Sequence, residues 1–375
     1  MDDSPRAARR LRGFAGAAAT SLVCLVMNKS LAWGVVLVLA LAVGAWVYLF
    51  HDFIEGDRVS WVKYKFGISV SPVVMVGRDG WLFAPGSPGD IDDYRGVARP
   101  DKKQLGRLRE VLTQRNDFVR SLGGRFVYVI GPMGETLYNE FLPPQYRQVG
   151  NRRRATIALE ELRDSGVEML YLTPAVARAK NRGRVLYKYE SHWNRLGSYV
   201  GSLEVISHLS QHHPAMKKTL ARVSDFELVH GPPVKNMWNT DRNYGSYLGV
   251  TLLEPDPEPV PKGGWTARME TRRYGKYGAD VFTKDDPSLP TLVMFGDSFM
   301  QGMRKVMAEN FRRAVFLNPW LVATYPLPET FTDFPAEVLE AEKPDVVIYE
   351  RWERSFMHTI LEWAPNAKLR PAGKK

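Results

Sequence analysis

The residues best suited to do chemistry are Gly296-Asp297-Ser298-Phe299, which directly follow the apolar run Leu292-Val293-Met294-Phe295. The apolar run predicts a short buried strand, and the glycine after it predicts a tight turn. A serine at such a strand-to-helix corner holds its hydroxyl out of the sheet, and its backbone N–H faces the space in which an oxyanion would form. The pattern therefore predicts a nucleophilic Ser298, with a simple Gly-Asp-Ser turn as the alternative.

A serine hydroxyl is a weak nucleophile until a base takes its proton, and the sequence offers His192 for this role. His192 lies in Glu190-Ser191-His192-Trp193-Asn194, where the carboxylate of Glu190 can orient the imidazole and stabilise its charged form. Asn194 is a good N-cap for a following helix. We therefore expect Ser298, His192 and Glu190 to form a catalytic triad, the alternative for His192 being a core histidine bonded to backbone.

Other residues near these segments are candidates for oxyanion or substrate binding, namely Gly296, Asp297, Trp193, Arg351 and Arg354. The two arginines follow the last apolar run of the chain and should reach the same edge of the sheet; structural ion pairs with Glu350 and Glu353 are the alternative. Asp297 either shapes its turn or caps the next helix. Trp193 is expected to be an apolar wall, or else a surface on which a sugar stacks.

Apolar runs alternate with segments of helical period over residues 71–362, which we take as one domain. The expected strands are an aromatic strand after the turn at 77–80 and the runs 126–130, 167–172, 292–295 and 346–349. The expected helices begin after Asp101, span 152–164, begin near Asn194, and span 300–313. This alternation predicts an α/β fold with a doubly wound, mostly parallel sheet and helices on both faces.

Residues 212–290 interrupt this pattern, because they are rich in proline, glycine and aromatic residues. They are expected to form an irregular insertion with a small β element. In doubly wound sheets, ligands bind beyond the carboxyl ends of the strands. We therefore expect His192 and Ser298 to meet at one rim of the sheet, although 106 positions separate them.

Residues 31–50 form an uncharged run of twenty residues, long enough as a helix to cross a bilayer. Basic residues crowd the segment before it and acidic residues follow it, at Arg6, Arg9, Arg10, Arg12, Lys29, Asp52, Glu55 and Asp57. This asymmetry predicts a cytoplasmic basic N-terminus over 1–30, a transmembrane anchor over 31–50 and an extracytoplasmic remainder that begins with a linker over 51–70. The composition of residues 363–375 indicates a basic, polar tail. A cleaved signal peptide is the competing interpretation. The uncharged stretch 13–27 is either an interfacial helix or a second span that would reverse this topology.

The formal net charge of +10 indicates an anionic surface or substrate nearby. Nucleic acid is disfavoured, because the positive charge is scattered and no nucleic-acid motif occurs; the short cluster Arg152-Arg153-Arg154 is read as a solvated helix face or as a polyanion contact. The single cysteine, Cys24, excludes an intramolecular disulfide and a cysteine-based metal site. His212-His213 lack a nearby acidic cluster, so we expect no metal and no cofactor.

Four motifs occur in an order that resembles the SGNH-hydrolase-like domain of the alginate O-acetyltransferase family. They are Gly-Arg-Asp-Gly-Trp-Leu-Phe at 77–83, Tyr-Asn-Glu-Phe-Leu-Pro-Pro at 138–144, His-Trp-Asn at 192–194 and Gly-Asp-Ser-Phe at 296–299. The resemblance covers about residues 70–360 and includes the family's permuted order, in which the acidic residue and histidine precede the serine. This chain has Glu190 where the family usually has aspartate.

The resemblance implies a membrane-anchored or periplasmic enzyme of the bacterial inner membrane. Such an enzyme would move an acetyl group through acetyl-Ser298 onto hydroxyls of an exported polysaccharide. It also implies a multipass membrane acyltransferase as the supplier of acetyl groups. Two alternatives stay open from the residues: an extracytoplasmic esterase or deacetylase with the same triad, and a non-catalytic polysaccharide-binding or scaffold subunit.

Overall fold

The computed structural model describes residues 33–44, 66–68, 74–84, 86–216, 224, 226–230, 234–235, 253–254, 257–318 and 334–357. The chain divides into two units, residues 1–62 and 63–375. In the first unit, residues 33–44 form a helix with exposed apolar side chains, inside the predicted anchor 31–50. Among the described residues, no helix combines the length and apolar character needed to cross a bilayer, so the anchor stays a prediction. The stretch 13–27 and the tail 363–375 lie outside the described residues.

The second unit is built on a seven-stranded sheet. In spatial order its strands are β4 (Glu168–Tyr171), β3 (Arg125–Gly131), β13 (Val346–Trp352), β11 (Thr291–Gly296), β12 (Arg313–Asn318), β10 (Tyr277–Thr283) and β9 (Arg268–Tyr274). The strands from β4 to β12 are parallel, and β10 and β9 are added antiparallel at one edge. The predicted mostly parallel sheet is thus confirmed.

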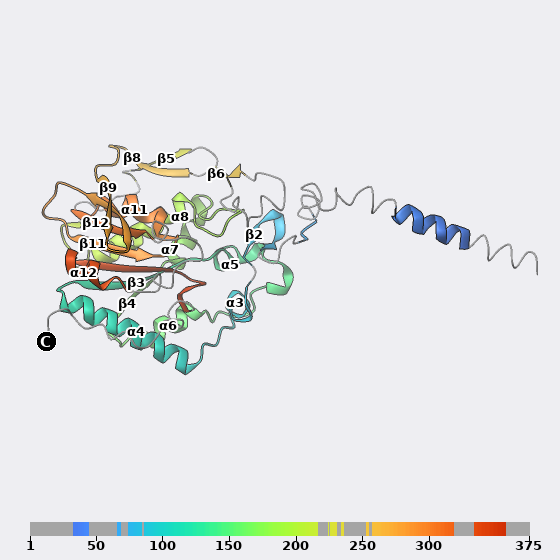
Figure 1. Cartoon of the computed structure of the whole chain (residues 1–375), viewed down its shortest axis with the longest axis horizontal. Coiled ribbons are helices and arrows are strands. Elements are labelled where there is room, and N and C mark those ends of the chain that lie inside the picture. Colours follow the sequence, from blue (N-terminus) through green and yellow to red (C-terminus); the bar gives the residue numbers. More distant parts are fainter. Residues whose placement is uncertain are drawn as a thin grey trace, which may run out of the picture. The chain divides into compact units, whose positions relative to one another are not determined.

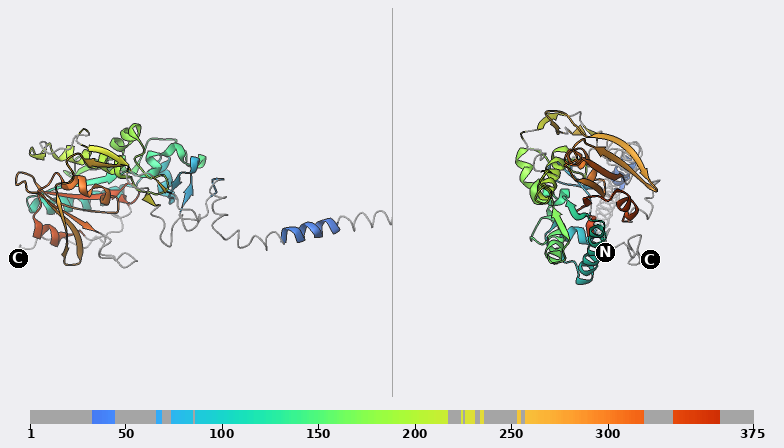
Figure 2. Two further views of the ribbon diagram at one scale, coloured as in Figure 1. Left: turned by 90° about the horizontal axis from the view of Figure 1, so that it is seen from above. Right: turned by 90° about the vertical axis from the view of Figure 1, so that its left-hand side faces the viewer.

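Helices cover both faces of this sheet (Figure 1). On one face lie α4 (Lys102–Ser121), α6 (Arg154–Leu162) and α12 (Ala336–Glu342), and on the other lie α8 (Arg195–Leu209) and α11 (Met300–Ala308). Two further views show the same layers (Figure 2). Each face has its own apolar core, which is why the inner parallel strands read as continuous apolar runs.

The strand order creates a switch point at the centre of the sheet. The chain passes outward from β3 to β4, then outward in the other direction from β11 to β12, and β13 returns to lie between β3 and β11. Ligand sites in open α/β sheets lie beyond the carboxyl ends of the strands at such a point. Here those ends belong to β3, β13 and β11.

Capping residues define the two longest helices. Asp101 accepts a hydrogen bond from the Gln104 N–H at 2.7 Å, and the Gln104 side chain accepts one from the Asp101 N–H at 3.0 Å, which forms a capping box before α4. The side chain of Asn194 accepts from the Gly197 N–H at 2.9 Å and caps α8. The predicted cap at Asn194 is thus confirmed, and so is the predicted start of a helix after Asp101.

Two sequence predictions are wrong. Residues 268–283 are not part of an irregular insertion, because they form β9 and β10 of the central sheet. The side chains of β9 are exposed except at its last residue, so this strand carries no apolar pattern by which sequence could reveal it. The predicted helix 300–313 ends at Ala308, and Arg313 begins β12, whose short apolar run merges with the helical pattern before it.

The remaining elements are short. Two ribbons stand apart from the main sheet, pairing β5 (Phe226–His230) with β8 (Pro257–Pro261) and β6 (Val234–Lys235) with β7 (Leu253–Glu254). A third pairs β1 (Met75–Val76) with β2 (Leu82–Phe83) around the predicted turn. The other short elements are η1 (Arg78–Gly80), α3 (Pro88–Tyr94), α5 (Gly134–Leu137), η2 (Asn139–Phe141), η3 (Pro144–Tyr146), α7 (Thr173–Arg178) and η4 (Ala179–Arg182).

Candidate active site

Ser298 lies at a sharp corner between the end of β11 and the start of α11. Gly296 makes the corner possible, because a Cβ there would lie 2.3 Å from the Glu350 carbonyl oxygen on the neighbouring strand. Asp297 fixes the turn by accepting the Phe299 N–H at 3.1 Å. Ser298 itself is half-buried, so its hydroxyl is anchored yet reachable.

His192 and Glu190 lie on a hairpin-like loop that leads into α8. An antiparallel bridge joins Leu186 to Trp193, and the Tyr187 N–H donates to the His192 carbonyl at 3.1 Å. These contacts narrow the loop and leave Glu190 near its tip, two residues before His192. The Asn194 cap then fixes where the helix begins.

The structure brings the three predicted residues into one hydrogen-bonded chain. The Nε2 atom of His192 lies 2.5 Å from the Ser298 Oγ. Its Nδ1 atom contacts Oε1 of Glu190, and the other carboxylate oxygen accepts the His192 backbone N–H at 3.1 Å. A carboxylate at Nδ1 favours the tautomer whose Nε2 can accept the serine proton. The arrangement can perform nucleophilic catalysis by general-base activation of Ser298.

The charge of Glu190 sets the proton affinity of the imidazole. Burial disfavours the charged imidazolium, but the negative charge and hydrogen bond of Glu190, with a smaller contribution from Asp297, outweigh it and raise the pKa of His192 above its usual value. The Glu190 side chain is 5% exposed and that of His192 is 20% exposed, so solvent screens this pair weakly. The imidazolium formed when Ser298 loses its proton is therefore stabilised.

Two of the sequence motifs support the loop that carries His192. Leu82, in the turn-and-strand motif, donates its N–H to the Lys188 carbonyl at 2.9 Å. The Tyr138 hydroxyl accepts the Val185 N–H at 3.1 Å. Trp81 stacks on Tyr138 with 4.2 Å between ring centroids, which joins the two supports. Residues 77–83 and 138–144 thus support the loop that carries His192.

Trp193 joins the segments that carry His192 and Ser298 from inside the core. Its Nε1–H donates to the Phe299 carbonyl at 2.9 Å, and the Phe299 ring packs against both His192 and Trp352. Trp193 is 4% exposed, so the suggestion that it offers a stacking surface to a sugar is wrong. The interpretation as an apolar wall agrees with this position. The sequence did not predict that the Phe299 ring packs between His192 and Trp352, although Phe299 directly follows Ser298 in the chain.

Asp297 ties the nucleophile corner to the end of β13. Besides the Phe299 N–H, it accepts hydrogen bonds from the Trp352 N–H at 2.8 Å and from the Ser355 hydroxyl at 3.1 Å. The role of shaping the turn therefore describes Asp297 better than contact with substrate.

The two candidate arginines occupy different surroundings. Arg351 is buried, and its guanidinium carbon lies 5.7 Å from the centroid of the Tyr349 ring. Arg354 forms an ion pair with Asp90 at 3.5 Å and lies over the Trp352 ring. The structure thus places Arg354 against α3.

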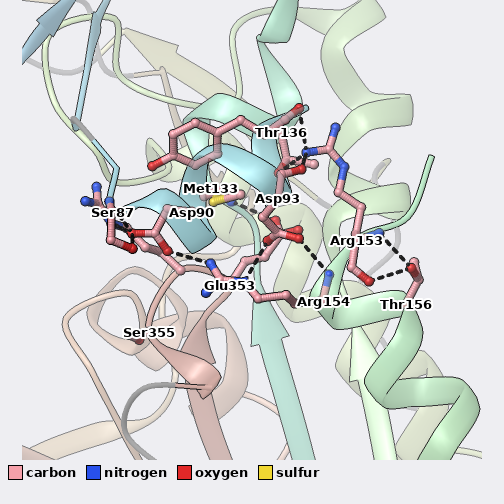
Figure 3. A network of polar contacts seen from close by, with 12 residues as sticks. Ser87, Asp90, Asp93, Met133, Thr136, Arg153, Arg154, Thr156, Glu353 and Ser355 are labelled. Atoms are coloured by element: carbon pink, nitrogen blue, oxygen red, sulfur yellow. Dashed lines mark hydrogen bonds and ion pairs between the residues drawn. The ribbon is translucent and has the colours of Figure 1, made fainter. Parts of the chain in front are cut away.

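A buried polar network beyond the carboxyl ends of β3 and β13 corrects the prediction made for the arginine cluster 152–154 (Figure 3). Arg153 and Arg154 were predicted on a solvated face or against a polyanion, but each is only 7% exposed. Arg154 forms ion pairs with Asp90 at 2.6 Å and Asp93 at 3.4 Å. In the same region Glu353 accepts the Met133 N–H at 3.3 Å, which joins the ends of β13 and β3. These charges hold α3, α6 and the sheet edge together.

Within the described part of the chain, no cluster of three or more potential metal ligands occurs.

Comparison with known proteins places this architecture in a family. A family model described as "SGNH hydrolase-like domain, acetyltransferase AlgX" matches residues 74–353. The chain belongs to this family. The family expected from the four motifs is thus confirmed, and the match spans the whole central sheet and the segments that carry His192 and Ser298.

The individual proteins that resemble this chain share little sequence identity with it. The chain is 24% identical over 194 residues to the probable alginate O-acetylase AlgJ of Pseudomonas putida, a match that covers 49% of this chain and 43% of that protein. Among solved structures, PatB1 of Bacillus cereus has a TM-score of 0.56 at 12% identity and covers 76% of this chain and 97% of its own. A DHHW family protein of Eubacterium siraeum has a TM-score of 0.50 at 12% identity, covering 77% and 98%. At these identities the structural likeness shows the fold.

Proposed function

We propose that this protein is an O-acetyltransferase that moves an acetyl group through an acetyl-Ser298 intermediate onto hydroxyls of an exported polysaccharide. The observation that carries the proposal is the 2.5 Å contact between His192 Nε2 and Ser298 Oγ, with the Glu190 carboxylate on the other ring nitrogen. Membership of the AlgX-type acetyltransferase family and the match to a protein named as an alginate O-acetylase support the acyl group and the polymer class.

The proposed reaction has two half-reactions, and His192 moves the proton in each. First, Ser298 Oγ attacks the acetyl carbonyl while its proton passes to Nε2, and the donor's leaving oxygen takes that proton as its bond to the acetyl carbon breaks. Next, a sugar hydroxyl gives its proton to Nε2 and attacks the serine ester. Collapse of that second intermediate releases the acetylated sugar, and Oγ recovers its proton from Nε2.

Each half-reaction passes through an oxyanion, which needs hydrogen-bond donors at the rim. The Ser298 backbone N–H is our first candidate, because it lies at the corner that Gly296 and Asp297 shape. Arg351 is the second candidate, because it lies at the end of the neighbouring strand β13.

We further propose that the catalytic domain acts outside the cytoplasm, held by the predicted anchor at the inner membrane beside a multipass acyltransferase that supplies acetyl groups. The basic residues before position 31 and the acidic residues after position 50 support this orientation. An anchored enzyme would meet its polymer during export.

The test is acetyl transfer by the full chain in detergent, with a chromogenic acetyl ester as donor and uronate or neutral oligosaccharides as acceptors. We expect ester turnover and an acetylated acceptor by mass spectrometry, both lost in Ser298→Ala and His192→Ala. Ser191→Ala is the matched control, because it removes a hydroxyl from the same loop and leaves the triad intact. Ester turnover that never yields an acetylated acceptor would instead indicate that the protein is an esterase. Absence of any ester turnover would indicate a non-catalytic polysaccharide-binding subunit.

A further inference from the structure

Glu350 is a buried carboxyl for which the proposed reaction has no use. It lies on β13 at the centre of the sheet, paired with Gly296 of β11 and with Val129 of β3. Its exposed fraction is 0%. Because strand residues alternate between faces, its side chain projects with that of Ile348 into the core beneath α8 and α11.

The two neighbouring strands leave space for this carboxyl. A Cβ at Gly131 would lie 2.9 Å from Oε1 of Glu350, and a Cβ at Gly296 would lie 3.0 Å from Oε2. Any side chain at either position would crowd the carboxyl. The same Cβ at Gly131 would lie 3.5 Å from the Phe299 ring and 3.8 Å from the Trp193 ring, the two rings that join the segments of Ser298 and His192. Glu350 therefore lies directly beneath the catalytic corner.

The surroundings favour an uncharged carboxyl. Within the described part of the chain, neither oxygen accepts a hydrogen bond of ordinary geometry. The charged groups that face Glu350 are Asp297 from the β11–α11 corner and Arg351 from its own strand, whereas β3 presents Gly131 and the loop before α8 presents Trp193. Burial, and then the negative charge of Asp297, outweigh the opposing effects of the Arg351 guanidinium and the Met300 N–H of α11 and raise the pKa of Glu350 well above its usual value. These surroundings favour the neutral acid over the carboxylate.

Asp297 accepts hydrogen bonds from three groups, which are two backbone N–H groups and a serine hydroxyl. We propose that neutral Glu350 donates its carboxyl proton in a hydrogen bond to Asp297, and that this carboxyl–carboxylate pair is a positioning device for Ser298. Glu350 acts only through Asp297, which holds the turn on one side and the end of β13 on the other. The effect on turnover rests on the proposed function, whereas the protonation state does not.

The device has a consequence at alkaline pH. When Glu350 loses its proton, two negative charges face each other beneath the corner, and their repulsion displaces Ser298 from His192. Glu350→Gln keeps the shape and a donor but cannot ionise. Glu350→Leu keeps a side chain of similar size and removes the donor.

The first test needs no activity. In an infrared difference spectrum of the full chain, wild type minus Glu350→Gln at neutral pH, we expect the carbonyl band of a protonated carboxylic acid. The folded state holds this proton more tightly than the unfolded state does. The contribution of protonated Glu350 to the free energy of unfolding is therefore complete below the usual pKa of glutamate, and it is lost as the pH rises through the raised pKa. The Tm of Glu350→Gln should accordingly rise relative to wild type with increasing pH.

Glu204→Gln, at a half-buried position on α8, is the control and should show neither effect. Carboxylate bands in place of the acid band, or Tm curves that stay parallel across the pH range, would overturn the neutral acid whether or not the protein turns over esters.

The second test is the pH–rate profile of ester turnover. We expect Glu350→Gln to keep its kcat and lose the alkaline limb, and Glu350→Leu to lower kcat about 10- to 100-fold with little change in KM, because a hydrogen bond to a charged group is lost. A fully active Glu350→Leu variant would refute the positioning role even if the acid band is present. A wild type without turnover would refute the proposed function and leave the infrared and Tm results to decide the state of Glu350.

Discussion

Glu190→Gln should disable His192 through its tautomer and leave the fold unchanged. One oxygen of Glu190 accepts the His192 backbone N–H at 3.1 Å, and the other contacts Nδ1. In the variant, the amide oxygen is expected to keep the backbone bond, which turns the amide NH2 toward Nδ1. Nδ1 must then accept, so Nε2 carries the proton and can no longer take one from Ser298. Loss of the correct tautomer costs about 10⁴-fold in kcat, or about 5 kcal/mol of activation free energy.

The same variant should change the pH dependence. Without the negative charge and hydrogen bond of Glu190, burial is opposed only by the smaller effect of Asp297, so the pKa of His192 falls. The base needs its neutral form, so the acid limb of kcat/KM for a chromogenic acetyl ester should move to lower pH. Glu190→Asp keeps the carboxylate about one methylene further away and should lose at most about 10²-fold. A Glu190→Gln loss below about tenfold, with the acid limb unmoved, would refute this reasoning.

Three further predictions concern the supports of the site. Tyr138→Phe should lower the free energy of unfolding in urea by about 1–3 kcal/mol, because the buried Val185 N–H loses its acceptor. Burial raises the pKa of Glu135 from its usual value of 4.5 to about 7. The contribution of protonated Glu135 to the free energy of unfolding is therefore complete below pH 4.5 and falls as the pH rises toward 7. Glu135→Gln should therefore gain up to about 3 kcal/mol relative to wild type over that range, measured by urea unfolding at each pH. Asn194→Ala should cost about 1 kcal/mol and also slow ester turnover, whereas Asp101→Ala at the equivalent cap of α4 should cost stability alone.

Ser298 and His192 could be predicted from sequence because each of them has a local signature. Ser298 follows an apolar strand and a glycine, and His192 lies just before a helix with a clear Asn194 cap. Parallel strands place their carboxyl ends at one rim, so the two segments were expected to meet. The 2.5 Å contact between them agrees with that expectation.

What sequence could not reveal depends on pairing between distant segments. The partners of Arg154 are Asp90 and Asp93, some sixty positions away, so a run of three arginines looked like a solvated face. Glu350 looked like an ion-pair partner for a neighbouring arginine, because only the strand order shows that it faces Gly296. Strand β9 has almost no buried side chains, so its place in the sheet is set by backbone pairing with β10.

The most direct test of the central claim is to trap the acyl-enzyme. Wild type is mixed briefly with an aryl acetate without acceptor, quenched in acid and digested, and the peptide that contains Ser298 is examined by mass spectrometry. We predict one added acetyl group on Ser298, absent in Ser298→Ala and in His192→Ala, and removed when an acceptor sugar is added before the quench. Acetylated sugar formed by an enzyme that never carries the Ser298 adduct, or formed equally by Ser298→Ala, would contradict the account.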